Sequence, residues 1–158
     1  MRRSLALLTV FAVVTPAAAL AARRDPNDGT LSVRDGRGTF MVSARGGIIG
    51  SFAHGRVIIT DPIDGDGTGP IVSGVDWHRD RSDTTTVYGG TRVRFRLIGG
   101  TFRIRVIGTG VNLSVVGRGS VTITGLGTLD DGTYSVNGGP EVGVPFLPEQ
   151  FALNASSP

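Results

Sequence analysis

Five arginines alternate with apolar residues over a short stretch of the chain, residues 91–107. Guanidinium groups bind carboxylate, sulfate and phosphate through paired hydrogen bonds, so arginines gathered on one face would form an anion-binding surface. We predict that such a surface binds an anionic envelope or extracellular polymer, such as an acidic polysaccharide or a cell-wall polymer. The alternative is a structural module that packs against an envelope protein. The arginines concerned are Arg92, Arg94, Arg96, Arg103 and Arg105.

A two-residue glycine link, Gly99-Gly100, joins the two alternating halves of this stretch. Two glycines between alternating runs predict a β-hairpin with a tight turn. In that register Arg94 lies opposite Arg105, and Arg96 lies opposite Arg103. The opposite face of the hairpin would then be apolar, with Val93, Phe95, Leu97, Phe102, Ile104 and Val106. Because like charges on facing strands repel each other, the arginine pairs would require a compensating partner.

A second candidate binding segment is residues 74–83, GVDWHRDRSD, which we read as a loop. Trp77 would be a platform for a sugar ring and His78 a hydrogen-bonding group. The competing interpretation places Trp77 in the core, since large aromatic side chains are mostly buried. A third hypothesis is a hydrolase centred on residues 77–83, but the chain lacks the G-x-S-x-G motif. We therefore expect a non-enzymatic protein.

Other site chemistries have little support in the sequence. The chain has no cysteine and only two histidines, so no zinc-binding pattern is present, and we expect no cofactor. Residues 61–68 are rich enough in aspartate to hold calcium, but recurrent Asp-Gly turns explain them more simply. Nucleic acid is not an expected partner, because no aromatic residue lies among the arginines on the same face of the predicted hairpin.

The composition predicts an all-β fold. Glycine is abundant, with 25 residues, and the apolar residues alternate in short Val- and Ile-rich runs. We expect an antiparallel β-sandwich or barrel of consecutive hairpins. Three short matching segments in the two halves suggest a duplicated meander. The alternative is a β-solenoid, because Val93, Phe102 and Val111 recur on the same face every nine residues.

The chain divides into three parts. Residues 1–22 have the basic start, apolar centre and small-residue end of a secretory signal peptide, so we expect a secreted or extracytoplasmic (cell-envelope) protein with no membrane span in its mature part. Residues 23–137 form a single predicted β-domain. Residues 138–158 are proline-rich, and we expect an irregular tail that partly covers an edge strand.

The second half of the chain also carries a resemblance. The stretch RFRLIGGTFRIRVIGTGVNLSVVGRGSVTITG, followed by GTYSVNGGP, resembles a recurring pattern in uncharacterised secreted bacterial β-rich proteins. The resemblance implies secretion and an all-β fold, and it carries no activity.

Overall fold

The computed structural model describes residues 25–155, and this part of the chain is all-β and antiparallel, as predicted. The predicted signal segment, residues 1–22, lies outside the described residues. Eight strands form one sheet that does not close into a barrel. They are β1 (Gly29–Thr60), β2 (Gly67–Ser73), β3 (Trp77–Ser82), β4 (Thr85–Gly99), β5 (Thr101–Gly125), β6 (Thr133–Val136), β7 (Val142–Gly143) and β8 (Glu149–Leu153). No helix of the described residues is long and apolar enough to cross a membrane.

The centre of the fold is one long antiparallel hairpin that coils on itself. β1 pairs with β4 and then with β5, from Thr60 opposite Thr85 to Gly29 opposite Gly117. The hairpin then pairs with its own next turn: Val42 lies between Ile104 and Val121, which are 17 residues apart in the sequence. One turn of the coil therefore takes about 17 residues of one strand.

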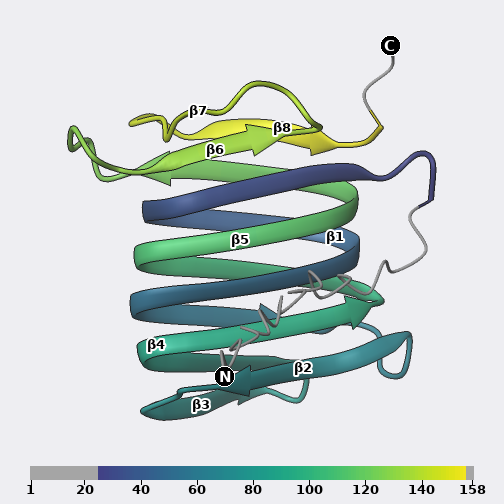
Figure 1. The fold of residues 1–158 in the computed structure, drawn as a ribbon. Helices are drawn as coiled ribbons and strands as arrows, with labels where there is room; N and C mark the ends of the chain where they lie inside the picture. The colour runs from purple at the N-terminus through teal and green to yellow at the C-terminus, as the bar shows by residue number, and fades with distance from the viewer. Residues whose placement is uncertain (1–24, 156–158) are drawn as a thin grey trace, which may run out of the picture.

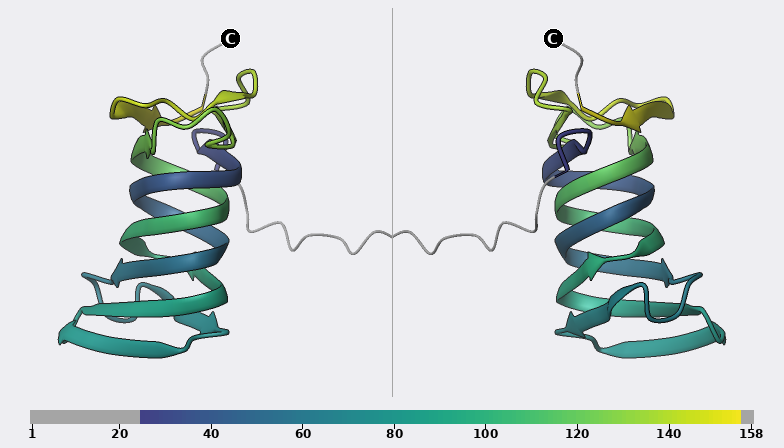
Figure 2. Two further views of the ribbon diagram at one scale, coloured as in Figure 1. Left: turned by 90° about the vertical axis from the view of Figure 1, so that its left-hand side faces the viewer. Right: turned by 90° about the vertical axis from the view of Figure 1, so that its right-hand side faces the viewer.

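The coil is flattened, so it has two broad walls. Figure 1 shows it face-on, and Figure 2 shows the same stack of turns edge-on. The first wall contains the cross-strand row Ile71, Arg96, Ile49 and Ser114. The second wall contains the row Val87, Ile58, Arg105, Met41 and Thr122. Inward-pointing side chains of both walls meet in a single core, which includes Phe40, Phe52 and Phe102, each at most 1% exposed.

Glycines form the two corners between the walls. At Gly55 φ is +147°, and a Cβ atom would lie 2.2 Å from the carbonyl oxygen of Ile107. At Gly46 φ is +151°, and the Cβ would lie 2.1 Å from the carbonyl oxygen of Val116. Only glycine fits where the chain bends this closely against the next turn. One corner stacks Gly90, Gly55, Gly108, Gly38 and Gly125; the other stacks Gly67, Gly99 with Gly100, Gly46, Gly117 and Gly29.

Polar side chains complete each corner at the ends of the coil, where no further turn supplies a backbone acceptor. Inside the coil, by contrast, the next turn supplies the acceptor: the Gly46 N–H donates to the Gly100 carbonyl oxygen at 2.9 Å. At one end the Asp66 carboxylate accepts from the Thr101 N–H at 2.9 Å, and Asp76 accepts from the Thr91 N–H at 3.0 Å.

At the other end the Asn137 side-chain oxygen accepts from the Thr30 N–H at 3.2 Å, and Asp131 accepts from the Gly127 N–H at 2.6 Å. These bonds satisfy corner N–H groups that would otherwise lack a partner.

The Asp131 cap gives a pH-dependent prediction. Its side chain, in a residue only 5% exposed, also accepts from the Thr128 hydroxyl and the Thr128 N–H. The Thr128 hydroxyl is the main cause that lowers the pKa of this carboxyl group, with the backbone N–H groups adding to it and burial opposing it. Asp131→Asn should therefore lower the midpoint of thermal unfolding by several degrees at neutral pH. The stabilisation needs the ionised form, so it is present above the ordinary aspartate pKa of about 3.9 and is lost as the pH falls further, through the lowered pKa of the folded state.

Thermal unfolding of both proteins between about pH 2 and pH 7 tests this prediction. Asp130→Asn is the matched control, because the neighbouring Asp130 side chain is 83% exposed and lies 3.9 Å from Arg37. A constant difference between the wild type and Asp131→Asn at all pH values would contradict the prediction.

The predicted tight hairpin at Gly99-Gly100 is wrong. The glycines form a corner of the coil, and the strands on either side pair with different partners. Ile98 and Thr101 are not opposite each other; Thr101 lies opposite Arg45. The nine-residue spacing that suggested a solenoid corresponds to the length of chain that crosses one wall and one corner. This length is half a turn of the coil.

The C-terminal segment is not wholly irregular. β8 (Glu149–Leu153) pairs with the free edge of β5, β6 pairs with the neighbouring edge of β1, and β7 pairs with β6. β2 and β3 cover the β4 edge at the other end of the coil (Figure 1). The expected covering of an edge strand by this segment is therefore confirmed for β8.

Candidate functional site

The coil divides the five predicted arginines among three places. Arg94 and Arg96 lie on β4 in the first wall, whereas Arg103 and Arg105 lie on β5 in the second wall. Half a turn of coil separates the two pairs, so their side chains point away from the core in opposite directions. Arg92 lies at a corner with φ of +58° and belongs to neither pair. The prediction of one continuous arginine face is therefore wrong.

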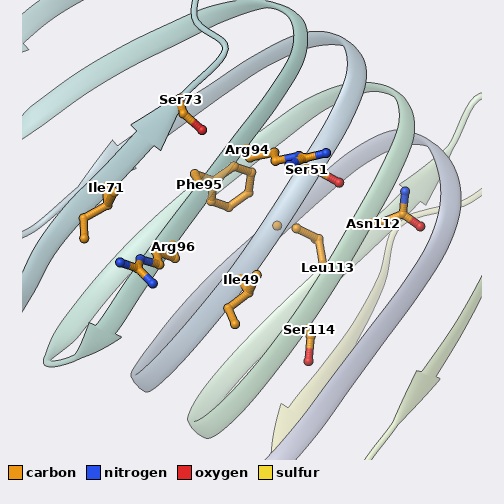
Figure 3. A pocket seen from close by; sticks show the side chains of 11 residues that line it. Ile49, Ser51, Ile71, Ser73, Arg94, Phe95, Arg96, Asn112, Leu113 and Ser114 are labelled. Atoms are coloured by element: carbon orange, nitrogen blue, oxygen red, sulfur yellow. The ribbon is translucent and has the colours of Figure 1, made fainter. Parts of the chain in front are cut away.

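The first wall carries a shallow groove of about 530 Å³ around its arginine pair (Figure 3). Arg94 lies between Ser51 on β1 and Ser73 on β2, and Arg96 lies between Ile49 and Ile71 on the same two strands. One arginine is thus flanked by hydroxyl groups and the other by aliphatic side chains. We call this group the first-wall site: Arg94, Arg96, Ser51, Ser73, Ile49 and Ile71.

The second wall repeats this arrangement around a smaller groove of about 190 Å³. Arg103 lies between Ser43 and Thr60, which both belong to β1, from successive turns of the coil. Arg105 lies between Met41 and Ile58 in the same way. The second-wall site therefore has the same alternation, with hydroxyl groups beside one arginine and aliphatic groups beside the next. Its members are Arg103, Arg105, Ser43, Thr60, Met41 and Ile58.

The register removes the expected repulsion between facing arginines. Every cross-strand neighbour of the four wall arginines is neutral. The outward positions are also solvent-exposed, so the guanidinium groups remain accessible. Like charges destabilise a sheet when they stand opposite each other, and the coil avoids this for the four wall arginines by placing the two pairs on different walls. Arg45 and Arg118, outside the wall sites, do lie opposite each other.

The wall arginines have no acidic partner within residues 25–155. The ion pairs of this region involve Arg34, Arg37 and Arg118. Arg118 contacts Asp25 at 2.6 Å, and Arg34 and Arg37 contact Glu141 and Asp130 at 3.7 and 3.9 Å. At the β6–β8 end of the coil, acidic residues thus pair with other arginines, and within residues 25–155 no acidic side chain forms an ion pair with an arginine of either wall site.

Trp77 and His78 lie on an exposed edge strand. The segment read as a loop contains β3, and all six of its residues are exposed. Trp77 is 49% exposed and its ring covers Gly89, so the interpretation that placed it in the core is wrong. The His78 ring is tilted against Tyr88, with ring centroids 6.3 Å apart. Both residues lie at the β2–β3 end of the coil, and neither lines the groove of either wall.

In the described residues, the side chains that the hydrolase and calcium hypotheses require are not arranged as a catalytic or metal-binding site. Asp80 accepts a hydrogen bond from the Thr86 hydroxyl at 2.7 Å, and the Ser82 hydroxyl lies 3.5 Å from that of Thr84. Neither is hydrogen-bonded to His78. Between residues 25 and 155, no group of three or more histidine, aspartate or glutamate side chains is arranged to hold a metal ion. Within residues 61–68, Asp66 instead caps a corner of the coil.

Sequence reasoning missed the residues that flank the arginines. Ser51 and Ile49 are more than 40 residues away from Arg94 and Arg96 in the sequence, and only the register brings them together. A usable signal was present in the glycines: Gly90, Gly99, Gly108 and Gly117 recur every nine residues and mark the corners. Comparison of the chain with known protein families, curated proteins and solved structures gave no match.

Proposed function

We propose that this protein is an exported, non-enzymatic β-domain that binds an anionic envelope or extracellular polymer through the arginines of its two wall sites. The observation that carries the proposal is the lack of any acidic partner for Arg94, Arg96, Arg103 and Arg105 within residues 25–155. Export rests on the signal-like pattern of residues 1–22.

Three features support binding of a polymer rather than a compact small ligand. Both grooves are open along a broad wall and neither is an enclosed cavity. Two arginines at alternate positions of a strand are about 7 Å apart along it, so each site presents two separate contacts to an extended ligand. The neighbouring serine and threonine hydroxyls add hydrogen-bonding groups on the same surface.

Binding to immobilised polygalacturonate and heparin over a salt series tests the proposal. Release of two counterions would weaken binding roughly tenfold between about 50 and 200 mM salt. The variant with Arg94, Arg96, Arg103 and Arg105 all changed to Gln should lose at least about tenfold in affinity and most of this salt dependence.

The matched control changes Arg34, Arg37, Arg81 and Arg118 to Gln, which removes the same charge from outside the two wall sites. Equal losses in the two variants would show that only net charge matters and would contradict the proposal. Binding that is strong but indifferent to salt would instead favour an apolar contact with an envelope protein.

A further inference from the structure

The two wall sites have a matched composition. In each, one arginine lies between two hydroxyl side chains and the next lies between two aliphatic side chains. The aliphatic neighbours are exposed in part: Ile49 is 64%, Ile71 is 44% and Met41 is 43% exposed. The same pattern therefore occurs once on the outer face of each wall, and the two outer faces point in opposite directions.

This pattern fits a carboxylated sugar chain better than other polyanions. Guanidinium groups pair with carboxylates, serine and threonine hydroxyls pair with sugar hydroxyls, and aliphatic side chains cover the C–H face of a sugar ring. A polyphosphate has no apolar face to place against Ile49 and Ile71. A membrane surface is flat and would contact one wall only, leaving the other site unused.

The geometry also determines how many ligand strands one molecule can bind. The two walls are separated by one layer of core side chains, so their backbones lie about 10 Å apart and their arginines point in opposite directions. One ligand strand on the first wall does not cover the second. Both sites are thus accessible at the same time.

We infer that one molecule binds two strands of an acidic polysaccharide, one on each wall, and so cross-links them. This inference rests on the proposed function and adds to it the ligand class and the number of sites. Loss of a single wall site should leave binding intact and abolish cross-linking. Loss of both sites should abolish both properties.

Calorimetry with short oligogalacturonate and light scattering with long polygalacturonate test the inference, using the wild type and two variants, Arg94→Gln/Arg96→Gln and Arg103→Gln/Arg105→Gln. We expect two oligosaccharides per wild-type chain and one per chain for each variant. Light scattering should rise when the wild type is mixed with the polymer and should stay near the level of the polymer alone for either variant. Arg34→Gln/Arg37→Gln, with the same charge change, should behave as the wild type, and circular dichroism should show that all variants are folded.

The possible results separate the two proposals. One oligosaccharide per wild-type chain, or cross-linking that survives in either wall variant, would overturn bivalency while leaving anion binding in place. Binding of polyphosphate equal to that of oligogalacturonate would overturn the ligand class. Failure of the wild type to bind any polyanion would overturn the proposed function itself.

Discussion

Gly55→Ala is expected to lower the free energy of unfolding by about 3 kcal/mol or more. The alanine would have to keep a φ near +147°, which L side chains rarely adopt, and its Cβ would lie 2.2 Å from the Ile107 carbonyl oxygen. Because that oxygen belongs to the backbone of the neighbouring turn, relief requires the two turns to move apart. Movement there would disturb the ladder on both sides, since Gly55 pairs with Gly90 and with Gly108.

Denaturant unfolding measures this effect, and Gly69→Ala is the matched control. A Cβ at Gly69 would have no heavy atom within 4 Å, so the change should be small, within about 0.5 kcal/mol. If Gly55→Ala were as stable as Gly69→Ala, the corner would tolerate a side chain. The stacked glycines would then not be what shapes the coil.

Phe102→Ala is the second change with a large expected effect, about 3–5 kcal/mol of lost stability. Phe102 is 1% exposed and lies in the single core that both walls share. Removing its ring costs the burial of the apolar surface and leaves a cavity that β-strands fixed by ladders on both edges cannot easily close.

The same substitution at an exposed phenylalanine serves as the control. Phe146 is 67% exposed, so Phe146→Ala should cost less than about 1 kcal/mol. Denaturant unfolding of the two variants should therefore separate them by at least about 2 kcal/mol. A similar loss in both would mean that the core described for the two walls does not carry the stability of the fold.

The alternation of residues 91–107 predicted correctly which side chains point inward. Val93, Phe95 and Phe102 are at most 2% exposed, and the arginines between them are exposed. The neighbours of those arginines were predicted wrongly. Arg94 was placed opposite Arg105, yet it lies between Ser51 and Ser73.

The error has a physical cause. Side chains alternate with a period of two, so a shift of the strand register by one residue would turn the core side chains outward. Pairing with a different strand in a register that matches polar with polar residues leaves every inward side chain inward. The local pattern therefore cannot distinguish a tight hairpin at Gly99-Gly100 from pairing with β1. The chain favours the second because Gly46, Gly55 and their stacked partners form corners at the same intervals.

The sequence by itself determined the all-β class, the inward and outward faces of the strands and the outward position of the arginines, because all three depend on local alternation and composition. Only the tertiary structure decided that these arginines form two separate sites. Coiling brings residues of β1 between segments of β4 and β5, and half a turn of coil separates Arg96 from Arg105. Which strands become neighbours depends on long-range pairing, and no short stretch of sequence contains that information.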